Sequence, residues 1–293
     1  MTNSYTNRRI LRICPQLVFL MMFIVGCNSI GVNSRSESPP GYDLNKPHVI
    51  KLPIELDEIS GVAFHPKDTS IFAINDERGW LYKIAPNSAA DIKKWKFADG
   101  GDFEDVVLLD SIFYVLKSNG NIISFKFIST DSLFLNEYSF PRQSGNEFEI
   151  LYFDHFRKKL TLICKDCETD KKKFLSTFTF DPWTFQYSDS SFTINSKRIA
   201  EMMEEKKIKF KPSAAGINPI TGELYVVSSV NKLFVICDND GNPKGIYKLS
   251  SDFKQPEGMC FTPAGNMIIS NEAADIGVAN IMVFQYNKAR IKK

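Results

Sequence analysis

The segment Glu257-Gly-Met-Cys-Phe-Thr-Pro-Ala-Gly-Asn-Met-Ile-Ile-Ser-Asn271 consists of two short apolar runs on either side of a Thr-Pro-Ala-Gly turn. Apolar runs of this length, bounded by Gly, Pro and Asn, are typical of two antiparallel strands joined by a tight turn. Similar segments begin at Glu58, Glu104, Glu149 and Ser213, so the intervals between starts are 46, 45, 64 and 44 residues. The sequence therefore predicts a repeated β unit.

Further strands follow in each repeat. The third strands are predicted at WLYKI, NIISFKF, KFLSTFTF, KLFVICD and NIMVFQY, and four repeats supply a fourth strand at IKKWKF, SLFLNEY, FQYSDSSFTI and GIYKLS. Four strands repeating every forty to fifty residues or so is the period of a β-propeller. The last repeat lacks a fourth strand of its own, and residues 48–52 can supply it. We therefore expect an all-β propeller of five blades closed by an N-terminal strand.

The long third interval leaves one alternative open. Six blades would result if residues 182–212 contained a degenerate blade. The excess is better explained by an insertion, because residues 196–208 (SKRIAEMMEEKKI) have a helix-forming composition with an apolar edge at Ile199, Met202 and Met203. We expect a helical insertion in this stretch.

Composition excludes some classes of function. The chain has 293 residues, 43% of them apolar, with 36 Lys and Arg against 34 Asp and Glu. Without the first 26 residues, which hold three Arg and no acid, the balance is 33 − 34 = −1. A nucleic-acid-binding protein that relies on positive charge is thus disfavoured. With three His in the chain, a His-rich metal site or a Ser/His/Asp active site is disfavoured too.

The N-terminus has the pattern of an export signal. Residues 8–12 are basic, and residues 17–25 form an apolar run too short to span a bilayer as a mature helix. The run leads to Ile24-Val25-Gly26-Cys27, which resembles a bacterial lipobox. We expect residues 1–26 to be a lipoprotein signal peptide, Cys27 to carry lipid, residues 27–46 to form a flexible tether and residues 47–293 to form the propeller domain. A retained membrane anchor with an unmodified Cys is the alternative.

These features predict the location and one partner. The chain would be held by the lipid on Cys27 to a membrane of the bacterial cell envelope. Asn28, next to the Cys, favours the outer membrane over the inner one. Among the other cysteines, Cys237 and Cys260 lie in apolar strand patterns and are expected to be buried thiols. Cys164 and Cys167 have CxxC spacing, without a second CxxC or a βαβ context to favour a zinc or redox site.

The repeat also predicts a site. The first strand of a propeller blade lines the central channel, and a carboxylate stands at its start in four repeats, namely at Glu58, Glu104, Glu149 and Glu257. The ends of the second strands add further polar residues: Asp76, Glu77, Lys117, Lys165, Asp166, Asn271 and Glu272. We expect these groups to meet at one mouth of the channel.

Crowded carboxylates need compensation, because like charges about 4–6 Å apart raise one another's pKa. A bound cation would supply it, and oxygen ligands without His or Cys favour Ca²⁺ or Mg²⁺ over zinc. We therefore expect Glu58, Glu104, Glu149 and Glu257 to bind Ca²⁺. Two alternatives need no metal: Lys117 and Lys165 could neutralise the mouth, or each Glu could accept backbone N–H groups of the next blade and lock the ring.

Several of these motifs, in order, resemble the SdiA-regulated (YjiK-like) propeller family. They are Glu58-Ile-Ser-Gly with Phe72-Ala-Ile-Asn-Asp-Glu77, Phe103-Glu-Asp, Glu147-Phe-Glu149, Cys164-Lys-Asp166, Pro212-Ser213, and Gln255-Pro-Glu-Gly258 with Ile269-Ser-Asn-Glu272. The resemblance covers about residues 47 to 287 and implies an exported or membrane-anchored propeller with acidic positions suited to Ca²⁺ at the channel mouth. The residues after Glu104, Glu149 and Ser213 depart from the family pattern.

Two classes of function follow. The first, which we favour, is an envelope-anchored binding protein whose ligand is unidentified, either a small molecule or another envelope protein. The alternative is a metal-dependent hydrolase of phosphoesters or lactones, in which a channel cation polarises the substrate and an Asp or Glu acts as base. The alternative rests on fold analogy alone, because the sequence presents no nucleophile with a base and no Gly-rich phosphate loop.

Overall fold

A computed structural model describes residues 35–85, 88–130, 132–141, 145–168, 170, 173–204, 209–273 and 277–291. Cys27 and the segment before it lie outside the described residues. The chain divides into two compact units, residues 1–32 and 33–293, and only the second is described below.

Twenty strands of this unit form five antiparallel sheets of four strands each. Blade one contains β2 (Ile59–Phe64), β3 (Ile71–Asn75), β4 (Trp80–Ala85) and β5 (Ser88–Lys96). Blade two contains β6 (Phe103–Leu109), β7 (Ile112–Lys117), β8 (Ile122–Ser129) and β9 (Ser132–Tyr138). Blade three contains β10 (Glu147–Asp154), β11 (Lys159–Asp166), β12 (Leu175–Asp181) and β13 (Gln186–Ile194).

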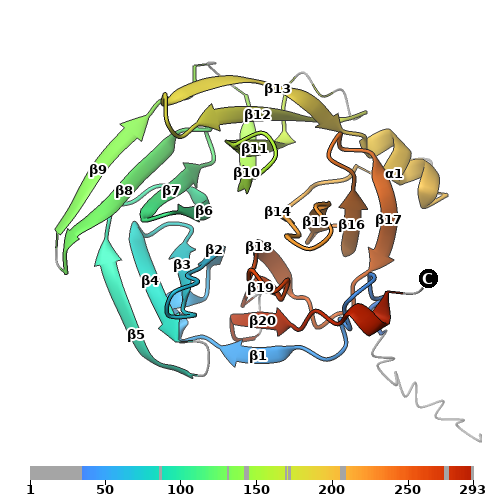
Figure 1. Cartoon of the computed structure of the whole chain (residues 1–293), viewed down its shortest axis with the longest axis horizontal. Coiled ribbons are helices and arrows are strands. Elements are labelled where there is room, and N and C mark those ends of the chain that lie inside the picture. The colour runs from blue at the N-terminus through green and yellow to red at the C-terminus, as the bar shows by residue number, and fades with distance from the viewer. Residues whose placement is uncertain are drawn as a thin grey trace, which may run out of the picture. The chain divides into compact units, whose positions relative to one another are not determined.

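The remaining two blades differ in how they are completed. Blade four contains β14 (Ala214–Ile217), β15 (Leu224–Ser228), β16 (Leu233–Cys237) and β17 (Pro243–Lys248). Blade five contains β18 (Gln255–Phe261), β19 (Met267–Glu272), β20 (Asn280–Phe284) and, from the other end of the chain, β1 (His48–Lys51). In Figure 1 the first strand of every blade lies toward the centre of the ring, and β1 lies outside β20.

The five-bladed prediction and its closure are therefore confirmed. β1 pairs antiparallel with β20, so that His48 faces Val283 and Lys51 faces Asn280. The stretch that could have held a sixth blade instead contains β13 and the helix α1 (Ser196–Met202). Asn195 caps this helix by accepting from the Arg198 N–H at 2.9 Å, and Ile199 is fully buried. Residues 205–208 of the expected helical insertion lie outside the described part.

The hydrophobic core lies between the blades. Five clusters of buried side chains fill these interfaces, and aromatic rings dominate the one between blades one and two. There Phe72 packs edge-on to Phe113, with ring centroids 4.8 Å apart, and Phe97 stacks on Phe125 at 5.1 Å. Among the described helices, which include the short η1 (Ile54–Leu56) and η2 (Lys288–Arg290), none is long and apolar enough to cross a membrane.

The flexible tether was predicted too long. From residue 35 onward the segment packs on the propeller, and Tyr42 and Leu44 are 1% and 2% exposed in the cluster between blades four and five. The Tyr42 hydroxyl donates to the Gly265 carbonyl at 2.6 Å and accepts from the Asn218 side-chain amide at 2.8 Å. Two apolar side chains and their polar partners are enough to fix a segment whose overall composition is that of a linker.

Candidate functional site

The acidic positions of the repeat coincide with β-bulges. The pairing of the first and second strands shifts register between Phe103 and Asp105, between Phe148 and Ile150, and between Pro256 and Gly258. The residues left at the shifts are Glu104, Glu149 and Glu257. A bulge re-aims the extra side chain away from the sheet faces. Here it turns three carboxylates toward the channel.

The same register places serines in the other two blades. In blade one the shift lies between Ile59 and Val62, which makes Ser60 the counterpart of Glu104. In blade four, Ala214 pairs with Val227, which makes Ser213 the counterpart of Glu257. The prediction from sequence aligned Glu58 with Glu104, so its alignment of blade one was wrong by two residues. Glu58 is exposed and does not line the channel cavity.

A second set of polar residues stands two positions earlier. Asp102, Glu147 and Gln255 occupy this position in blades two, three and five, and Glu58 occupies it in blade one. The site prediction omitted Asp102 and Glu147, although both precede a predicted Glu by two residues. Alternation along a strand would have revealed them, because residues two apart share a face.

The second strands contribute at their ends. Asp76, Lys165 and Glu272 reach the channel mouth as predicted, and Ser118 does so in blade two. Lys117 turns away instead, and its ammonium lies 3.3 Å from Glu137 on β9. Glu77 is exposed beside the mouth, and the fully buried Asn271 donates to Asn280 at 3.2 Å.

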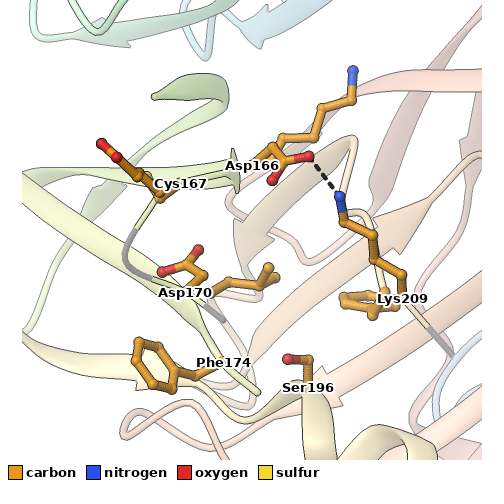
Figure 2. Close-up of a pocket in the computed structure, with 10 residues that line it drawn as sticks. Asp166, Cys167, Asp170, Phe174, Ser196 and Lys209 are labelled. Atoms are coloured by element: carbon orange, nitrogen blue, oxygen red, sulfur yellow. Dashed lines mark hydrogen bonds and ion pairs between the residues drawn. The ribbon is translucent and has the colours of Figure 1, made fainter. Parts of the chain in front are cut away.

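Asp166 faces a different cavity. Its carboxylate accepts from the Lys209 ammonium at 2.5 Å and lies 3.7 Å from that of Lys211. Figure 2 shows this smaller cavity, of about 230 Å³, with Asp170 and Ser196 on its wall. Asp166 is therefore separate from the channel residues.

The channel mouth is a cavity of about 330 Å³. Seven carboxylates and one lysine line it, together with Ser60, Ser118 and Gln255; the charged residues are Asp76, Asp102, Glu104, Glu147, Glu149, Glu257, Glu272 and Lys165. Four of the five blades contribute a carboxylate. We call this set the acidic mouth.

Burial and mutual repulsion raise the pKa of the acids in the mouth. Burial, reinforced by Glu149, raises the pKa of Glu104 to about 10. Burial with Glu272 raises the pKa of Glu257 to about 8, and burial with Asp76 raises that of Glu272 to about 7. The pKa of Asp76 is raised to about 6 by burial and by Asp102. The mouth without a cation therefore retains protons at neutral pH.

Lys165 is the internal counter-charge of the mouth. Its ammonium donates to Glu149 and lies 3.5 Å from Glu147. Although burial lowers the pKa of Lys165, these carboxylates raise it overall. A disulfide between Cys164 and Cys167 brackets Lys165, so the end of β11 that carries it is covalently constrained. Cys237 is a buried free thiol, as predicted. Cys260 is a free cysteine that is partly exposed as a residue, while its thiol packs against the core between blades five and one, where burial raises its pKa.

Three carboxylates of the mouth have the spacing of a cation site. Carboxylate oxygens of Asp76, Asp102 and Glu104 lie within 4.8 Å of one another. The Asp76 Oδ1 atom is buried without a hydrogen-bond partner, whereas Asp102 accepts from the Ser118 hydroxyl. An all-oxygen donor set with one orphaned carboxylate oxygen suits a hard divalent cation.

Residues other than the four predicted Glu hold neighbouring blades together through hydrogen bonds to backbone groups. Asp105, 1% exposed, accepts from the backbone N–H of Val106 at 2.8 Å and, across the blade boundary, from that of Leu151 at 2.9 Å. The Ser213 hydroxyl donates to the Pro256 carbonyl at 2.5 Å, and the Ser270 hydroxyl donates to the Ser60 carbonyl at 2.8 Å. These bonds join neighbouring blades through backbone groups.

The sequence profile of one family matches residues 40–274, under the description SdiA-regulated. The chain belongs to the SdiA-regulated family. The match runs from before β1 to the end of β19, so it includes every residue that lines the acidic mouth and leaves out only β20 among the strands. The resemblance inferred from the repeat motifs is therefore confirmed. A search of curated protein sequences found no match.

Solved structures share the fold of this SdiA-regulated propeller at low identity. Glutaminyl cyclase of Myxococcus xanthus is 13% identical with a TM-score of 0.53, over 82% of this chain and 94% of its own. A luciferin-regenerating enzyme is 11% identical with a TM-score of 0.51, over 83% and 98%. A putative glucose dehydrogenase from Thermus is 9% identical with a TM-score of 0.50, over 82% and 100%. These likenesses show the fold alone.

Proposed function

We propose that this SdiA-regulated propeller is a binding protein that holds Ca²⁺ in the acidic mouth and uses it to bind a ligand through oxygen atoms. The observation that carries the proposal is the convergence of Asp76, Asp102 and Glu104, with the Asp76 Oδ1 atom buried and unpartnered. Seven carboxylates against one lysine leave the mouth in need of positive charge.

The chemistry of the donors selects the class of cation. The residues that line the mouth offer carboxylate, hydroxyl and amide oxygens and no imidazole or thiol, which suits Ca²⁺ or Mg²⁺ better than zinc. Ca²⁺ takes six to eight oxygen ligands, about twice the number that three carboxylates supply in monodentate fashion. The remaining positions are available to water or to a ligand that enters from the open end of the mouth.

The proposal retains part of the predicted ligand set. Glu104 belongs to the cation site, whereas Glu149 is held by Lys165 and Glu257 lies nearer Glu272. These two carboxylates contribute to the negative electrostatic potential of the mouth. Glu58 acts from the rim, where its charge contributes to the raised pKa of Asp76 and Glu272.

Calorimetry with and without Ca²⁺ tests the proposal. A cation that binds only the folded state raises stability by RT ln(1 + [L]/Kd), about 2.7 kcal/mol at a hundredfold excess over Kd. Wild type should melt at higher temperature in millimolar Ca²⁺ than in EDTA. Glu104→Gln should abolish this difference, because it removes a charged ligand and keeps the shape. Glu77→Gln, which changes an exposed carboxylate beside the mouth, is the matched control.

Two results would contradict the cation site. One is a melting temperature of wild type that does not respond to millimolar Ca²⁺. The other is an equal Ca²⁺ response in wild type and Glu104→Gln, since the cation would then bind elsewhere.

We further propose that the protein is anchored to a membrane of the bacterial envelope, with the outer membrane favoured, through lipid on Cys27. The support is the order of basic residues, apolar run and Ile24-Val25-Gly26-Cys27 in the sequence. Metabolic labelling with palmitate tests it, because Cys27→Ser removes the acylated thiol. Full incorporation of palmitate into Cys27→Ser would refute the anchor, and Cys14→Ser is the control that should label normally.

A further inference from the structure

A second cavity lies at the opposite end of the channel from the acidic mouth. The mouth is formed where the inner strands begin, whereas this cavity is formed by the later parts of the same five strands, residues 62–64, 106–108, 151–153, 216–217 and 259–261. Its volume is about 410 Å³. We call it the apolar end of the channel.

Between the two ends, neighbouring inner strands pack closely side by side. A Cβ atom on Gly61 would lie 2.6 Å from the Asp105 Cα atom, and one on Gly258 would lie 2.6 Å from the Ser60 carbonyl oxygen. Real Cβ atoms do not approach this closely, so both glycines are needed where β2, β6 and β18 meet. The buried Asp105 carboxylate lies at the same level. Among the described residues, none lines both cavities, so a ligand at one end and a ligand at the other would have no lining residue in common.

The wall of the apolar end is poor in polar side chains. Valine, leucine, phenylalanine and proline predominate, and the lining residues with a polar side-chain atom are Tyr152, His155, Cys260 and Thr262. The cavity is open to solvent and most of its exposed lining is apolar, so an apolar molecule that displaces water from it would bury apolar surface. The volume lies within the range of about 300–1,000 Å³ typical of small-molecule pockets.

Exposed apolar side chains extend this surface at the rim. Phe156, next to His155, is 61% exposed and lies against the turn at Gly222 of the adjacent blade. Ile220, next to Pro219, is 43% exposed and lies against the turn at Gly265. Two such side chains fixed beside one opening give an entering apolar molecule further contact area.

We propose that the apolar end of the channel binds a neutral, largely apolar small molecule, independently of the cation in the acidic mouth. The cavity fits this occupant better than a peptide, because a peptide backbone would bring N–H and C=O groups into a site with few side chains to pair with them. The imidazole of His155 at the opening can pair with one polar group of such a ligand.

The free thiol of Cys260 allows a site-specific test. Cys260 is a partly exposed residue of the cavity wall, whereas Cys237 is buried in blade four. Because burial raises the pKa of the Cys260 thiol and the thiolate is the reactive form, the alkylation is run at mildly alkaline pH and followed over a long time course. The full-length protein in EDTA is alkylated with N-ethylmaleimide at increasing concentrations of N-phenyl-1-naphthylamine, a neutral apolar probe. The rate at each cysteine is followed by peptide mass spectrometry. The probe should slow alkylation of Cys260 at least tenfold and saturably, and by a larger factor than it slows alkylation of Cys237, whose buried thiol reacts only when the fold opens.

A cavity-filling variant provides the second arm. Leu108→Trp enlarges a partly exposed side chain on the cavity wall and should remove the protection of Cys260 by the probe. Leu135→Trp, on the outer strand β9 and 41% exposed, is the matched control and should keep it. If Leu108→Trp fails to fold, the wild-type measurement decides alone.

Three results would overturn the proposal. They are an unchanged rate at Cys260 in saturating probe, an equal slowing at Cys260 and Cys237, and protection by uncharged phosphatidylcholine vesicles in the absence of protection by the soluble probe. The last result would mean that this end of the propeller contacts a membrane. None of the three depends on Ca²⁺, so they leave the proposed cation site untouched.

Discussion

The ammonium group of Lys165 donates to the carboxylate of Glu149 inside the channel, across the neighbouring strands β11 and β10. Glu149 is 7% exposed, and Lys165 is the cation that the mouth contains in the described part of the chain. A buried carboxylate held this way is committed to its lysine and is less free to bind an added cation. The mouth is therefore divided into Glu147 and Glu149, which lie beside Lys165, and the acids on which Lys165 acts only at longer range, which are Glu104, Glu257 and Glu272.

Lys165→Met should have opposite effects on stability with and without Ca²⁺. Without Ca²⁺ the melting temperature should fall, because Glu149 loses its partner, and the fall should be smaller at lower pH, because burial raises the pKa of Glu149 and favours its neutral form. With Ca²⁺ the rise in melting temperature should exceed that of wild type, since Glu149 becomes available. Lys117→Met removes a surface pair worth at most about 1 kcal/mol and is the control, measured by calorimetry. An unchanged Ca²⁺ response in Lys165→Met would contradict the division of the mouth.

Stability in EDTA should decrease as pH rises from about 5 to about 8. The folded-state pKa values of Asp76, Glu272 and Glu257 are raised to about 6, 7 and 8, above those of unfolded Asp and Glu. The folded state thus binds more protons than the unfolded state in this range. Each group's contribution to the free energy of unfolding is therefore complete below the pKa of the unfolded state and is lost as pH rises through the pKa of the folded state. Ca²⁺ should flatten the decrease by replacing the protons. Thermal melts across pH check this, and a stability in EDTA that rises with pH would refute it.

Asp105→Asn should destabilise the fold without changing the Ca²⁺ response. An asparagine offers one acceptor oxygen where Asp105 accepts from two backbone N–H groups, and its amide would face one of them. We expect a loss of about 1–3 kcal/mol, the cost of an unsatisfied buried donor. Urea denaturation measures it, with Asp110→Asn as control, because Asp110 lies in an exposed turn at φ 56°, which asparagine tolerates. Equal stability of the two variants would mean that Asp105 does not lock the blades.

Truncation of the N-terminal segment should destabilise the fold only if it removes residues beyond residue 34. A chain that begins at Arg35 keeps the buried Tyr42 and Leu44, whereas one that begins at Lys46 loses both. The longer truncation should melt at lower temperature, and Tyr42→Phe should lose about 1–3 kcal/mol by stranding the Asn218 amide and the Gly265 carbonyl. Equal melting temperatures of the two truncations would show that the packing of this segment adds nothing.

The fold was predictable from the sequence because each blade repeats one local pattern. Alternating apolar runs and turn residues fix strands within a repeat, and the missing fourth strand after Tyr286 indicated closure by residues 48–52. The site was predictable only in part, because acids occur at two positions of the repeat that are two residues apart, and residue type alone does not tell one position from the other. Glu58 therefore aligned with Glu104 by residue type, while the backbone placed Ser60 there.

Other errors came from the direction of single side chains. Lys117 and Ser118 are neighbours at the end of β7, and successive residues of a strand point to opposite sides, so one of them had to turn away from the mouth. The sequence alone does not show which. The Cys164–Cys167 bond escaped prediction for a related reason, since a spacing does not reveal whether two thiols face each other.

Closure by β1 also sets the order in which the molecule can be completed. Lys51 pairs with Asn280, 229 residues later, so the first strand to be synthesised needs the last one as its partner. At about 5–20 residues per second, synthesis leaves the edge of β1 unpaired for roughly 10–50 s. Such non-local pairing slows folding and exposes a strand edge to other chains. The nascent protein therefore depends on being kept from aggregation until its final blade has emerged.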